Sequence, residues 1–241
     1  MIYDPIASLL GRWSSEINVY SSTTKEFFDK VDALPQNEKD SLPVYDGELL
    51  LTAHGVGSYT SRTVTKRWNR KCELLADACE RFATAAFVSG FSDYPLQKLD
   101  QGWKKVIAHQ FHDDITGTSF EECYKRNHND YVQAMNAFSD EYTAACKSIA
   151  DNLDTSFVKG IPIVVSNPLQ ASSVRKDAVS VTLKSNAEHF RVFDQNGVEV
   201  PSQMRTATDG KKEIIFIAEV LSCGLAVYDL RESDRDSTVE T

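Results

Sequence analysis

The sequence feature that most constrains the fold is a long series of apolar residues spaced three and four positions apart. This spacing places the apolar side chains on one face of a helix, and each such face needs a partner surface. The first stripe consists of Val64, Trp68, Cys72, Leu75, Cys79, Phe82 and Ala86. A second stripe follows over 96–110 and a third over 120–153. Three such helices can bury one another, so the sequence predicts a three-helix bundle within a domain of residues 46–157.

Local signals place the ends of these helices. Pro95 suits the first turn of the second helix, which we expect to end near His112. Thr118 and Ser119 are each followed by a glutamate three residues later, which is the spacing of a capping box at the start of the third helix.

After residue 158 the pattern changes to short runs rich in Val, Ile and Phe, which are typical of strands. The runs are Ile161 to Val165, Val179 to Leu183, His189 to Asp194, Val198 to Met204, Glu213 to Val220 and Leu225 to Leu230. Asn196-Gly197 and Asp209-Gly210 are hairpin signals. We therefore expect an antiparallel β-sandwich-like region over 158–232, followed by a tail, 233–241, that frays.

Residues 1–45 are less informative. Thr23 and Glu26 have the spacing of a capping box and start a short helix that Pro35 ends. This segment is too small to fold alone.

Composition restricts the possible functions. The chain carries 26 Lys and Arg against 35 Asp and Glu, a net charge of −9, and is 41% hydrophobic. We expect a folded, soluble protein that binds neither nucleic acid nor membrane, because both surfaces attract basic residues. The longest apolar runs are far shorter than the roughly 20 residues that cross a bilayer, and no export signal is visible. The cellular compartment stays open.

Polar residues concentrate between the second and third helices. His109, His112, Asp113 and Asp114 lie within six residues and offer nitrogen and oxygen atoms of the kind that bind zinc. On one continuous helix His109 and His112 would be neighbours, whereas the two aspartates would diverge. The competing interpretation is that an aspartate caps or solvates a turn and that both histidines are ordinary junction residues.

The run Gln-Phe-His-Asp-Asp-Ile-Thr-Gly-Thr-Ser, residues 110–119, resembles the signature of glycoside hydrolase family 38, the class II alpha-mannosidases. In that family a Gln-x-His-Asp stretch precedes a Thr-Gly-Thr turn. Further segments are similar to the family in the same order: Asp46 to Leu49, Tyr59 to Arg62, Lys66 to Arg70, Ser166 to Leu169 and Val200 to Gln203. The resemblance extends over about residues 42–232.

The resemblance implies an α+β fold, with a three-helix bundle followed by an antiparallel β-sandwich-like region and a short remnant of an α/β catalytic domain in 1–45. It implies that His112 is one ligand of an active-site zinc ion and that Asp113 contacts bound mannose. The activity implied is retaining hydrolysis of alpha-linked mannosides through a glycosyl-enzyme. His109 and Asp114 match no role in the family.

The resemblance also implies what this chain lacks. The family's nucleophile, acid/base and remaining zinc ligands belong to an N-terminal α/β domain, so we expect no catalytic residue within this chain. The chain would be an internal fragment or a truncated reading frame whose missing partner is that domain. Because zinc sites use about three or four protein donors, we expect the chain alone to hold zinc weakly or not at all, and to be inactive.

Two other functions remain open. A helical metal-dependent phosphohydrolase could use the His112 and Asp113 doublet with His54 upstream and an acid such as Asp140 downstream. That function requires every metal ligand to lie within this chain. Alternatively, the chain could be a non-catalytic helical and β module that binds a protein partner or a sugar.

Overall fold

The computed structural model describes residues 22–47, 55–170, 173–185 and 187–239. The chain divides into two compact units, Met1–Thr52 and Ala53–Thr241. In the first unit the described residues form α2 (Thr24–Asp32) and α3 (Gln36–Lys39). The Thr23 hydroxyl accepts a hydrogen bond from the Glu26 amide at 3.2 Å, so the expected cap of this short helix is confirmed.

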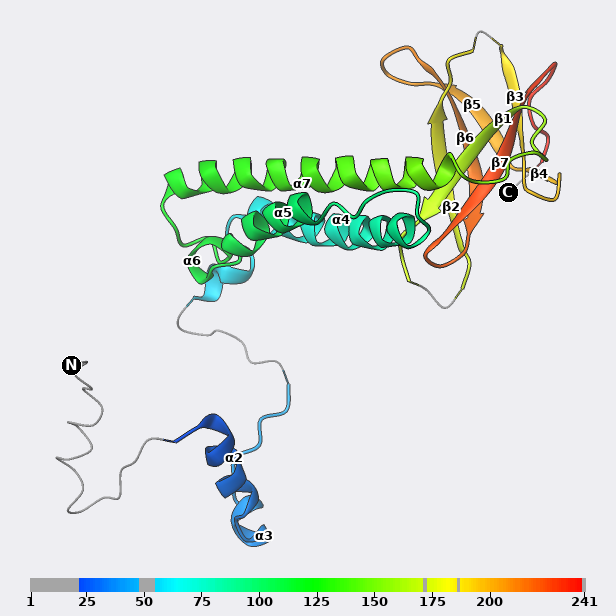
Figure 1. The fold of residues 1–241 in the computed structure, drawn as a ribbon. Helices are drawn as coiled ribbons and strands as arrows, with labels where there is room; N and C mark the ends of the chain where they lie inside the picture. The colour runs from blue at the N-terminus through cyan, green and yellow to red at the C-terminus, as the bar shows by residue number, and fades with distance from the viewer. Residues whose placement is uncertain (1–21, 48–54, 171–172, 186, 240–241) are drawn as a thin grey trace, which may run out of the picture. The chain divides into compact units, whose positions relative to one another are not determined.

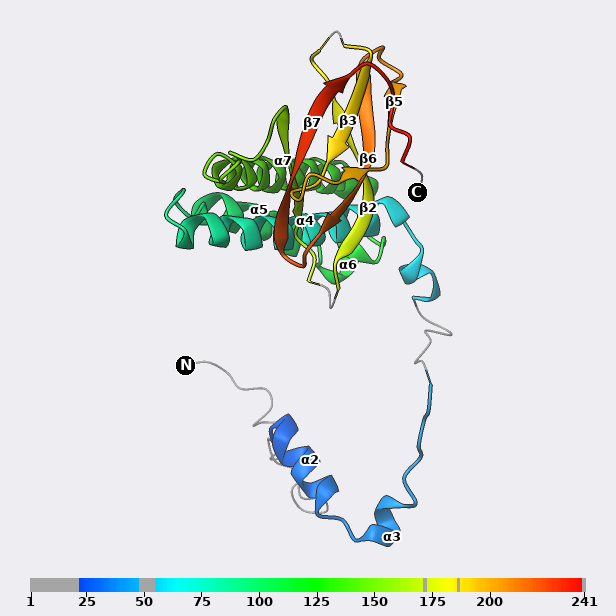
Figure 2. The same cartoon turned by 90° about the vertical axis from the view of Figure 1, so that its right-hand side faces the viewer.

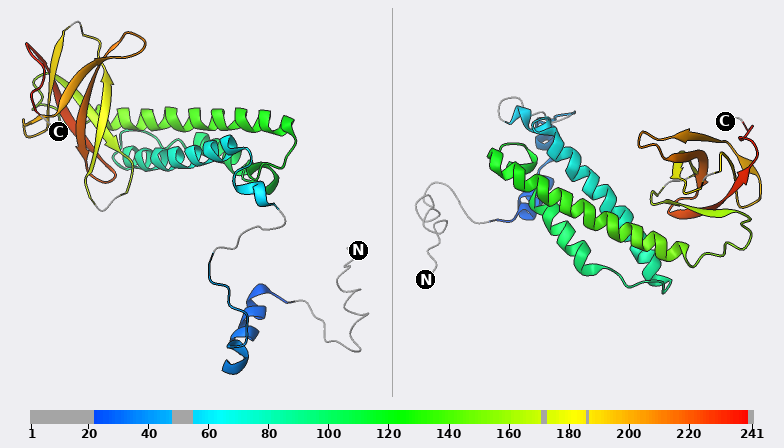
Figure 3. Two further views of the ribbon diagram at one scale, coloured as in Figure 1. Left: turned by 180° about the vertical axis from the view of Figure 1, so that it is seen from behind. Right: turned by 90° about the horizontal axis from the view of Figure 1, so that it is seen from above.

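The second unit begins with a helical bundle (Figure 1). Its elements are η1 (Val56–Tyr59), α4 (Thr63–Val88), α5 (Leu96–Ala108), α6 (His112–Ile115) and α7 (Glu121–Ala150). The three long helices α4, α5 and α7 pack side by side, which Figure 3 shows from behind and from above. The predicted three-helix bundle is therefore confirmed.

Most residues in the core of the bundle come from the predicted stripes, although Val64, the first residue of the first stripe, is exposed. Its buried residues are Cys72, Ala76, Cys79, Leu99, Val106, Tyr131, Ala134 and Phe138. Gly102 allows α5 to approach α7 closely, because a methyl group at this position would lie 2.7 Å from the Phe138 ring. None of the helices in the described ranges combines the length and the apolar content that a membrane span requires.

The strands form two antiparallel sheets that face each other (Figure 2). One sheet has the order β1 (Ile161–Asn167), β7 (Gly224–Ser233), β3 (His189–Phe193), β4 (Glu199–Val200). The other has the order β2 (Arg175–Thr182), β6 (Lys212–Val220), β5 (Ser202–Thr206). Buried residues from both sheets share one core, which contains Phe190, Val192, Ile214, Phe216, Ala218, Val220, Tyr228 and Leu230. The α+β fold class with a sandwich-like β region is confirmed.

Both predicted hairpins are present. Asn196-Gly197 connects β3 to β4, and the Asp194 carboxylate accepts hydrogen bonds from the Asn196 and Val198 amides. Asp209-Gly210 connects β5 to β6.

One strand prediction was wrong. The run expected as a single strand, 198–204, is divided at Pro201 into β4 and β5, which belong to different sheets. Proline has no N–H group to donate to a ladder, so the chain leaves one sheet at this residue and joins the other.

The bundle and the sandwich meet at the C-terminal half of α7. The Tyr142 and Ser166 hydroxyls lie 2.9 Å apart, and Leu225 of β7 packs against a second buried cluster of the bundle that includes Phe82 and Ala145. Beyond β7, Asp236 contacts His189 and Ser237 contacts Glu199. The domain boundaries given above remain predictions.

Candidate functional site

The predicted site lies where α5 turns into α7 through the short helix α6. Helix α5 ends at Ala108 with His109 as its C-cap, and α6 begins at His112 after the extended residue Phe111. Our expectation that the second helix continues to about His112 was therefore wrong. Because the chain turns between the two histidines, His109 and His112 do not share a helical face.

His112 and Asp113 lie together at the surface. Their side chains are 76% and 53% exposed, and His112 Nε2 lies 3.5 Å from Asp113 Oδ2. The Phe111 ring packs against the imidazole, with centroids 4.2 Å apart. The structure thus brings the two residues of the predicted site together and leaves both open to a ligand.

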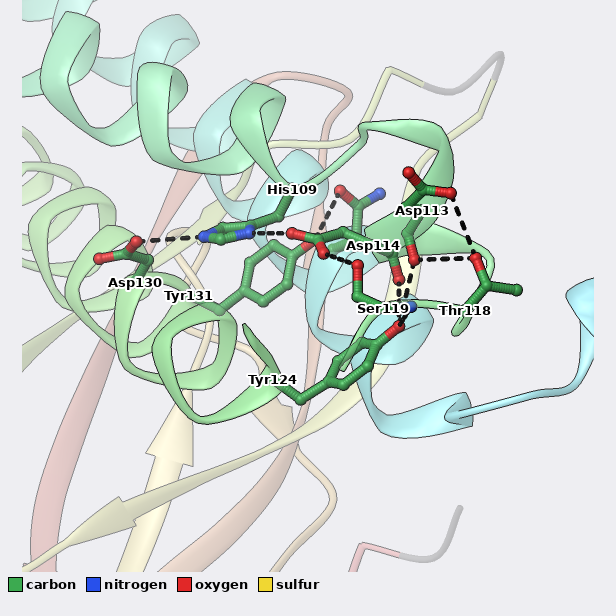
Figure 4. A network of polar contacts seen from close by, with 9 residues as sticks. His109, Asp113, Asp114, Thr118, Ser119, Tyr124, Asp130 and Tyr131 are labelled. Carbon is green, nitrogen blue, oxygen red and sulfur yellow. Dashed lines mark hydrogen bonds and ion pairs between the residues drawn. The ribbon is translucent and has the colours of Figure 1, made fainter. Parts of the chain in front are cut away.

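His109, which had no role in the sequence interpretation, is the buried centre of a charged network (Figure 4). Its Nδ1 atom lies 2.8 Å from Asp114 Oδ2, and its Nε2 atom lies 3.1 Å from Asp130 Oδ2 on α7. Each ring nitrogen of His109 thus faces one carboxylate, and an ionised carboxylate can only accept hydrogen bonds. Lys105 adds a hydrogen bond of 3.1 Å to Asp130.

Both aspartates of the network favour the charged form. Burial raises the pKa of Asp114, but hydrogen bonds from His109 and Ser119 outweigh this effect and the net pKa is lowered. Burial also raises the pKa of Asp130, and hydrogen bonds from His109 and Lys105 reverse it in the same way. The two carboxylates of the network are therefore stabilised in their ionised form.

The hydroxyls expected to cap α7 are used elsewhere. The N-cap position of α7 is Phe120, whose side chain has no hydrogen-bonding group. Ser119 donates instead to Asp114 Oδ1 at 2.7 Å, and Thr118 donates to the Asp113 carbonyl at 3.3 Å. The predicted capping box is therefore wrong, because these hydroxyls bind the aspartates of α6.

Tyr124, on the first turn of α7, supports the peptide units of α6 from below (Figure 4). Its hydroxyl accepts a hydrogen bond from the Ser119 amide at 3.1 Å and can donate to the Asp113 carbonyl at 3.2 Å. The Arg62 guanidinium lies over the Tyr124 ring, 4.1 Å from its centroid. Arg62 adopts φ +47°, a conformation that is uncommon for residues other than glycine.

Residues at the start of α4 contact the segment that connects α6 to α7. Lys66 Nζ donates to the carbonyls of Ile115, at 2.7 Å, and Ser61, at 2.6 Å, and burial lowers its pKa. Gly117 adopts φ +88°, and a methyl group there would lie 2.5 Å from Ser61 Oγ. Gly117 in the Thr-Gly-Thr turn was the sequence signal that could have indicated this close approach.

The described residues do not assemble a complete metal site. No group of three or more His, Cys, Asp or Glu side chains that could hold a metal ion occurs in the part of the chain that the structure describes. His112 and Asp113 offer at most two donors, whereas zinc sites use three or four. These residues fit one edge of a zinc coordination sphere and not the whole of it.

Within the described residues, the ligands expected for a phosphohydrolase do not lie close together. His54 lies outside the described residues. Asp140 lies on α7 sixteen residues beyond Tyr124, about 24 Å along the helix axis, while Tyr124 itself contacts Asp113. Asp140 is thus too far from His112 to share a metal ion with it.

Comparison with known proteins identifies the helical part. Residues 56–149 match the alpha mannosidase middle domain family. Alpha-mannosidase G of Dictyostelium discoideum is 39% identical over 106 residues, which cover 43% of this chain and 9% of that protein. The alpha-mannosidase of Saccharomyces cerevisiae is 34% identical over 106 residues, covering 43% of this chain and 10% of that protein. The human alpha-mannosidase 2C1 is 29% identical over 104 residues, with the same two coverages.

Solved structures share the fold over nearly the whole chain. An alpha-mannosidase from Enterococcus faecalis V583 has a TM-score of 0.69 and 19% identity, covering 97% of this chain and 31% of that one. A glycosyl hydrolase family 38 protein from Enterococcus faecalis has a TM-score of 0.63 and 19% identity, covering 98% of this chain and 31% of that one.

The fold and the matched segment define an alpha-mannosidase middle domain continued by an antiparallel β region. Residues 56–149 are thus similar to the middle domain of alpha-mannosidases, and the chain shares its fold with solved alpha-mannosidase and glycosyl hydrolase family 38 structures. It spans only about a tenth of the curated relatives and about a third of the solved structures that it matches.

Proposed function

We propose that this chain forms one wall of the active site of a zinc-dependent, retaining alpha-mannosidase. In this proposal His112 is one zinc ligand and Asp113 contacts the substrate. The observation that carries it is the exposed His112 and Asp113 pair, presented together on α6 within the segment that matches the alpha-mannosidase middle domain. Zinc, when bound, would hold sugar hydroxyls and favour distortion of the sugar ring.

The chemical roles of the two side chains follow from their donor and acceptor capacity. A neutral imidazole nitrogen is a zinc ligand at about 2 Å, and the exposed ring of His112 can turn one nitrogen outward without losing a buried contact. The Asp113 carboxylate accepts hydrogen bonds from hydroxyl groups, which an alpha-linked mannoside supplies. The pair therefore recognises a sugar and a metal without itself cleaving the glycosidic bond.

The remaining machinery belongs, in this proposal, to an N-terminal catalytic domain outside the described residues. Retaining glycosidases need two carboxyl groups about 5 Å apart, one as nucleophile and one as acid/base. We assign neither role to a residue of this chain. The isolated chain should neither bind zinc tightly nor hydrolyse an aryl alpha-mannoside.

A graft tests the assignment of His112. Residues 56–149 would replace the matching segment of alpha-mannosidase G from Dictyostelium discoideum. The graft should bind about one zinc ion per site and hydrolyse an aryl alpha-mannoside. His112→Ala should abolish both properties. His128→Ala is the matched control, because His128 packs against Trp68 on the bundle with ring centroids 4.9 Å apart and should leave both unchanged.

If the folded graft binds no zinc, or if His112→Ala retains zinc and activity as the control does, His112 is not a ligand. Asp113→Asn should keep the zinc ion while raising KM or lowering kcat, and an unchanged kcat/KM would remove Asp113 from the substrate site. Tight zinc binding by the isolated chain would contradict the assignment of the other ligands.

A further inference from the structure

We propose that His109 and Asp114 are positioning residues, which together with Asp130 hold residues 110–119 in the conformation that presents His112 and Asp113. The consequence for the active site rests on the proposed function, whereas the structural part does not. The network joins three elements, since His109 caps α5, Asp114 lies on α6 and Asp130 lies on α7. The His109 side chain is only 9% exposed.

The position of Asp114 on α6 determines which way its neighbours face. Successive side chains of a helix differ in direction by about 100°. The side chains of His112 and Asp114, which are two positions apart, therefore differ by roughly 200°. When the Asp114 side chain is held inward by His109, the His112 side chain on the same turn faces the opposite side. The 76% exposure of His112 agrees with this geometry. A helix of one turn has too few internal hydrogen bonds to fix this orientation by itself.

Packing alone would not require charges at this point. Placing an imidazole and two carboxylates in a poorly solvated position is costly, and apolar side chains of similar size would hold the helices together at least as well. Hydrogen bonds between charged groups have a narrower geometry than apolar contacts. The His109 network therefore specifies the orientation of α6 in addition to its attachment.

Backbone hydrogen bonds within residues 110–119 depend on the inward position of Asp114. The Thr118 and Ser119 amides donate to the Asp113 carbonyl at 3.1 and 3.0 Å, and they close the loop directly behind the exposed pair. If His109 is removed, Asp114 and Asp130 lose their shared hydrogen-bond partner and the inward position of Asp114 is no longer stabilised. The two amides should then exchange with solvent more rapidly.

Hydrogen exchange by NMR on the metal-free chain is the first measurement. His109→Ala should increase the exchange rates of the Thr118 and Ser119 amides at least tenfold relative to the wild type. The amides in the middle of α4 should show no such increase. His109→Gln, which keeps one donor, should give a smaller increase and serves if His109→Ala does not fold. Glu80→Gln is the control, because Glu80 accepts a hydrogen bond from Trp103 elsewhere in the bundle at 2.6 Å.

Zinc affinity in the graft is the second measurement. Loss of a partner that orients a ligand weakens metal binding by about 10–100-fold. His109→Ala should show this loss, His109→Gln should recover part of it, and Glu80→Gln should show none.

Three results would overturn the inference: loop amides that exchange at the same rate in His109→Ala, an equal increase in Glu80→Gln, or faster exchange with unchanged zinc affinity. The two proposals fail separately. The exchange experiment needs no metal and can fail while His112→Ala still abolishes zinc binding. If His112→Ala has no effect in the graft, the proposed function fails, whatever the exchange rates are.

Discussion

The sandwich holds a buried aspartate and the bundle a partly buried one, and the two are used differently. In the sandwich, the Asp229 carboxylate accepts hydrogen bonds from the Gly160 and Lys159 amides at 2.8 and 2.9 Å and from Arg231 Nε at 2.8 Å. Asp229 thereby fixes the segment that leads into β1. In the bundle, Asp114 fixes a turn on which the two preceding side chains, His112 and Asp113, remain exposed. A hydrogen-bonded aspartate therefore holds a connecting segment in place in the sandwich, whereas in the bundle it holds a turn that presents His112 and Asp113.

The two regions also have separate apolar cores. The core of the bundle and that of the sandwich contain different buried residues, and Tyr142 and Ser166 make a polar contact where the regions meet. We expect a substitution deep in one core to lower the stability of that region first.

The largest effect should come from Phe138→Ala. Phe138 is fully buried, and its ring lies 5.8 Å from that of Trp103. Truncation leaves a cavity and should reduce the free energy of unfolding of the bundle by about 3–5 kcal/mol. Chemical denaturation followed by far-UV circular dichroism, which detects helix, measures this loss. Val132→Ala, at a more exposed position on α7, is the control, and a loss below about 1 kcal/mol for Phe138→Ala would contradict the assignment of the core.

A smaller effect, with a distinct pH dependence, is expected from Asp229→Asn. Removing this charge should cost about 2–4 kcal/mol at neutral pH, because buried donors lose a charged acceptor. Burial raises the pKa of Asp229, but hydrogen bonds from Lys159, Arg231 and Gly160 outweigh it and lower the net pKa. The stabilisation is therefore fully present above the unfolded-state pKa of about 3.9 and is lost as the pH falls through the lower folded-state value.

Urea unfolding between about pH 2 and pH 7 tests this dependence. The difference in unfolding free energy between the wild type and Asp229→Asn should shrink as the pH is lowered below about 4. Asp93→Asn, at an exposed aspartate between α4 and α5, should behave like the wild type. A difference that stays constant over the whole range would show that the charge of Asp229 contributes nothing to stability.

The smallest effect is expected from Gly117→Ala in the bundle, compared with Gly210→Ala in the sandwich. Gly117 and Gly210 have similar backbone angles, φ +88° and +82°. At Gly117 the new methyl group would clash with Ser61, whereas at Gly210 it would meet no atom of the described residues within 4 Å. Both substitutions should cost about 1 kcal/mol through backbone strain, and Gly117→Ala should cost about 1–2 kcal/mol more. Equal losses in thermal or urea unfolding would mean that the loop yields freely at Ser61.

Periodicity and turn chemistry predicted most of the fold. The apolar stripes identified α4, α5 and α7, and the Asn196-Gly197 and Asp209-Gly210 turns identified two hairpins. The missed break at Pro201 and the early end of α5 are changes of direction inside patterned segments, where tertiary contacts decide the outcome. The family resemblance indicated His112 and Asp113. It could not indicate His109, whose partner Asp130 lies 21 residues further along the chain. Polar contacts of this range have no periodic signal in a single sequence.

The break at Pro201 links the two faces of the sandwich mechanically. Val200 is the last residue of β4 in one sheet and Ser202 is the first residue of β5 in the other, so the single residue Pro201 connects the two sheets here. A force that pulls one sheet away from the other acts directly on the backbone at Pro201, because no longer loop lies between β4 and β5. The covalent connection between β4 and β5 therefore restrains the separation of the two sheets at this edge.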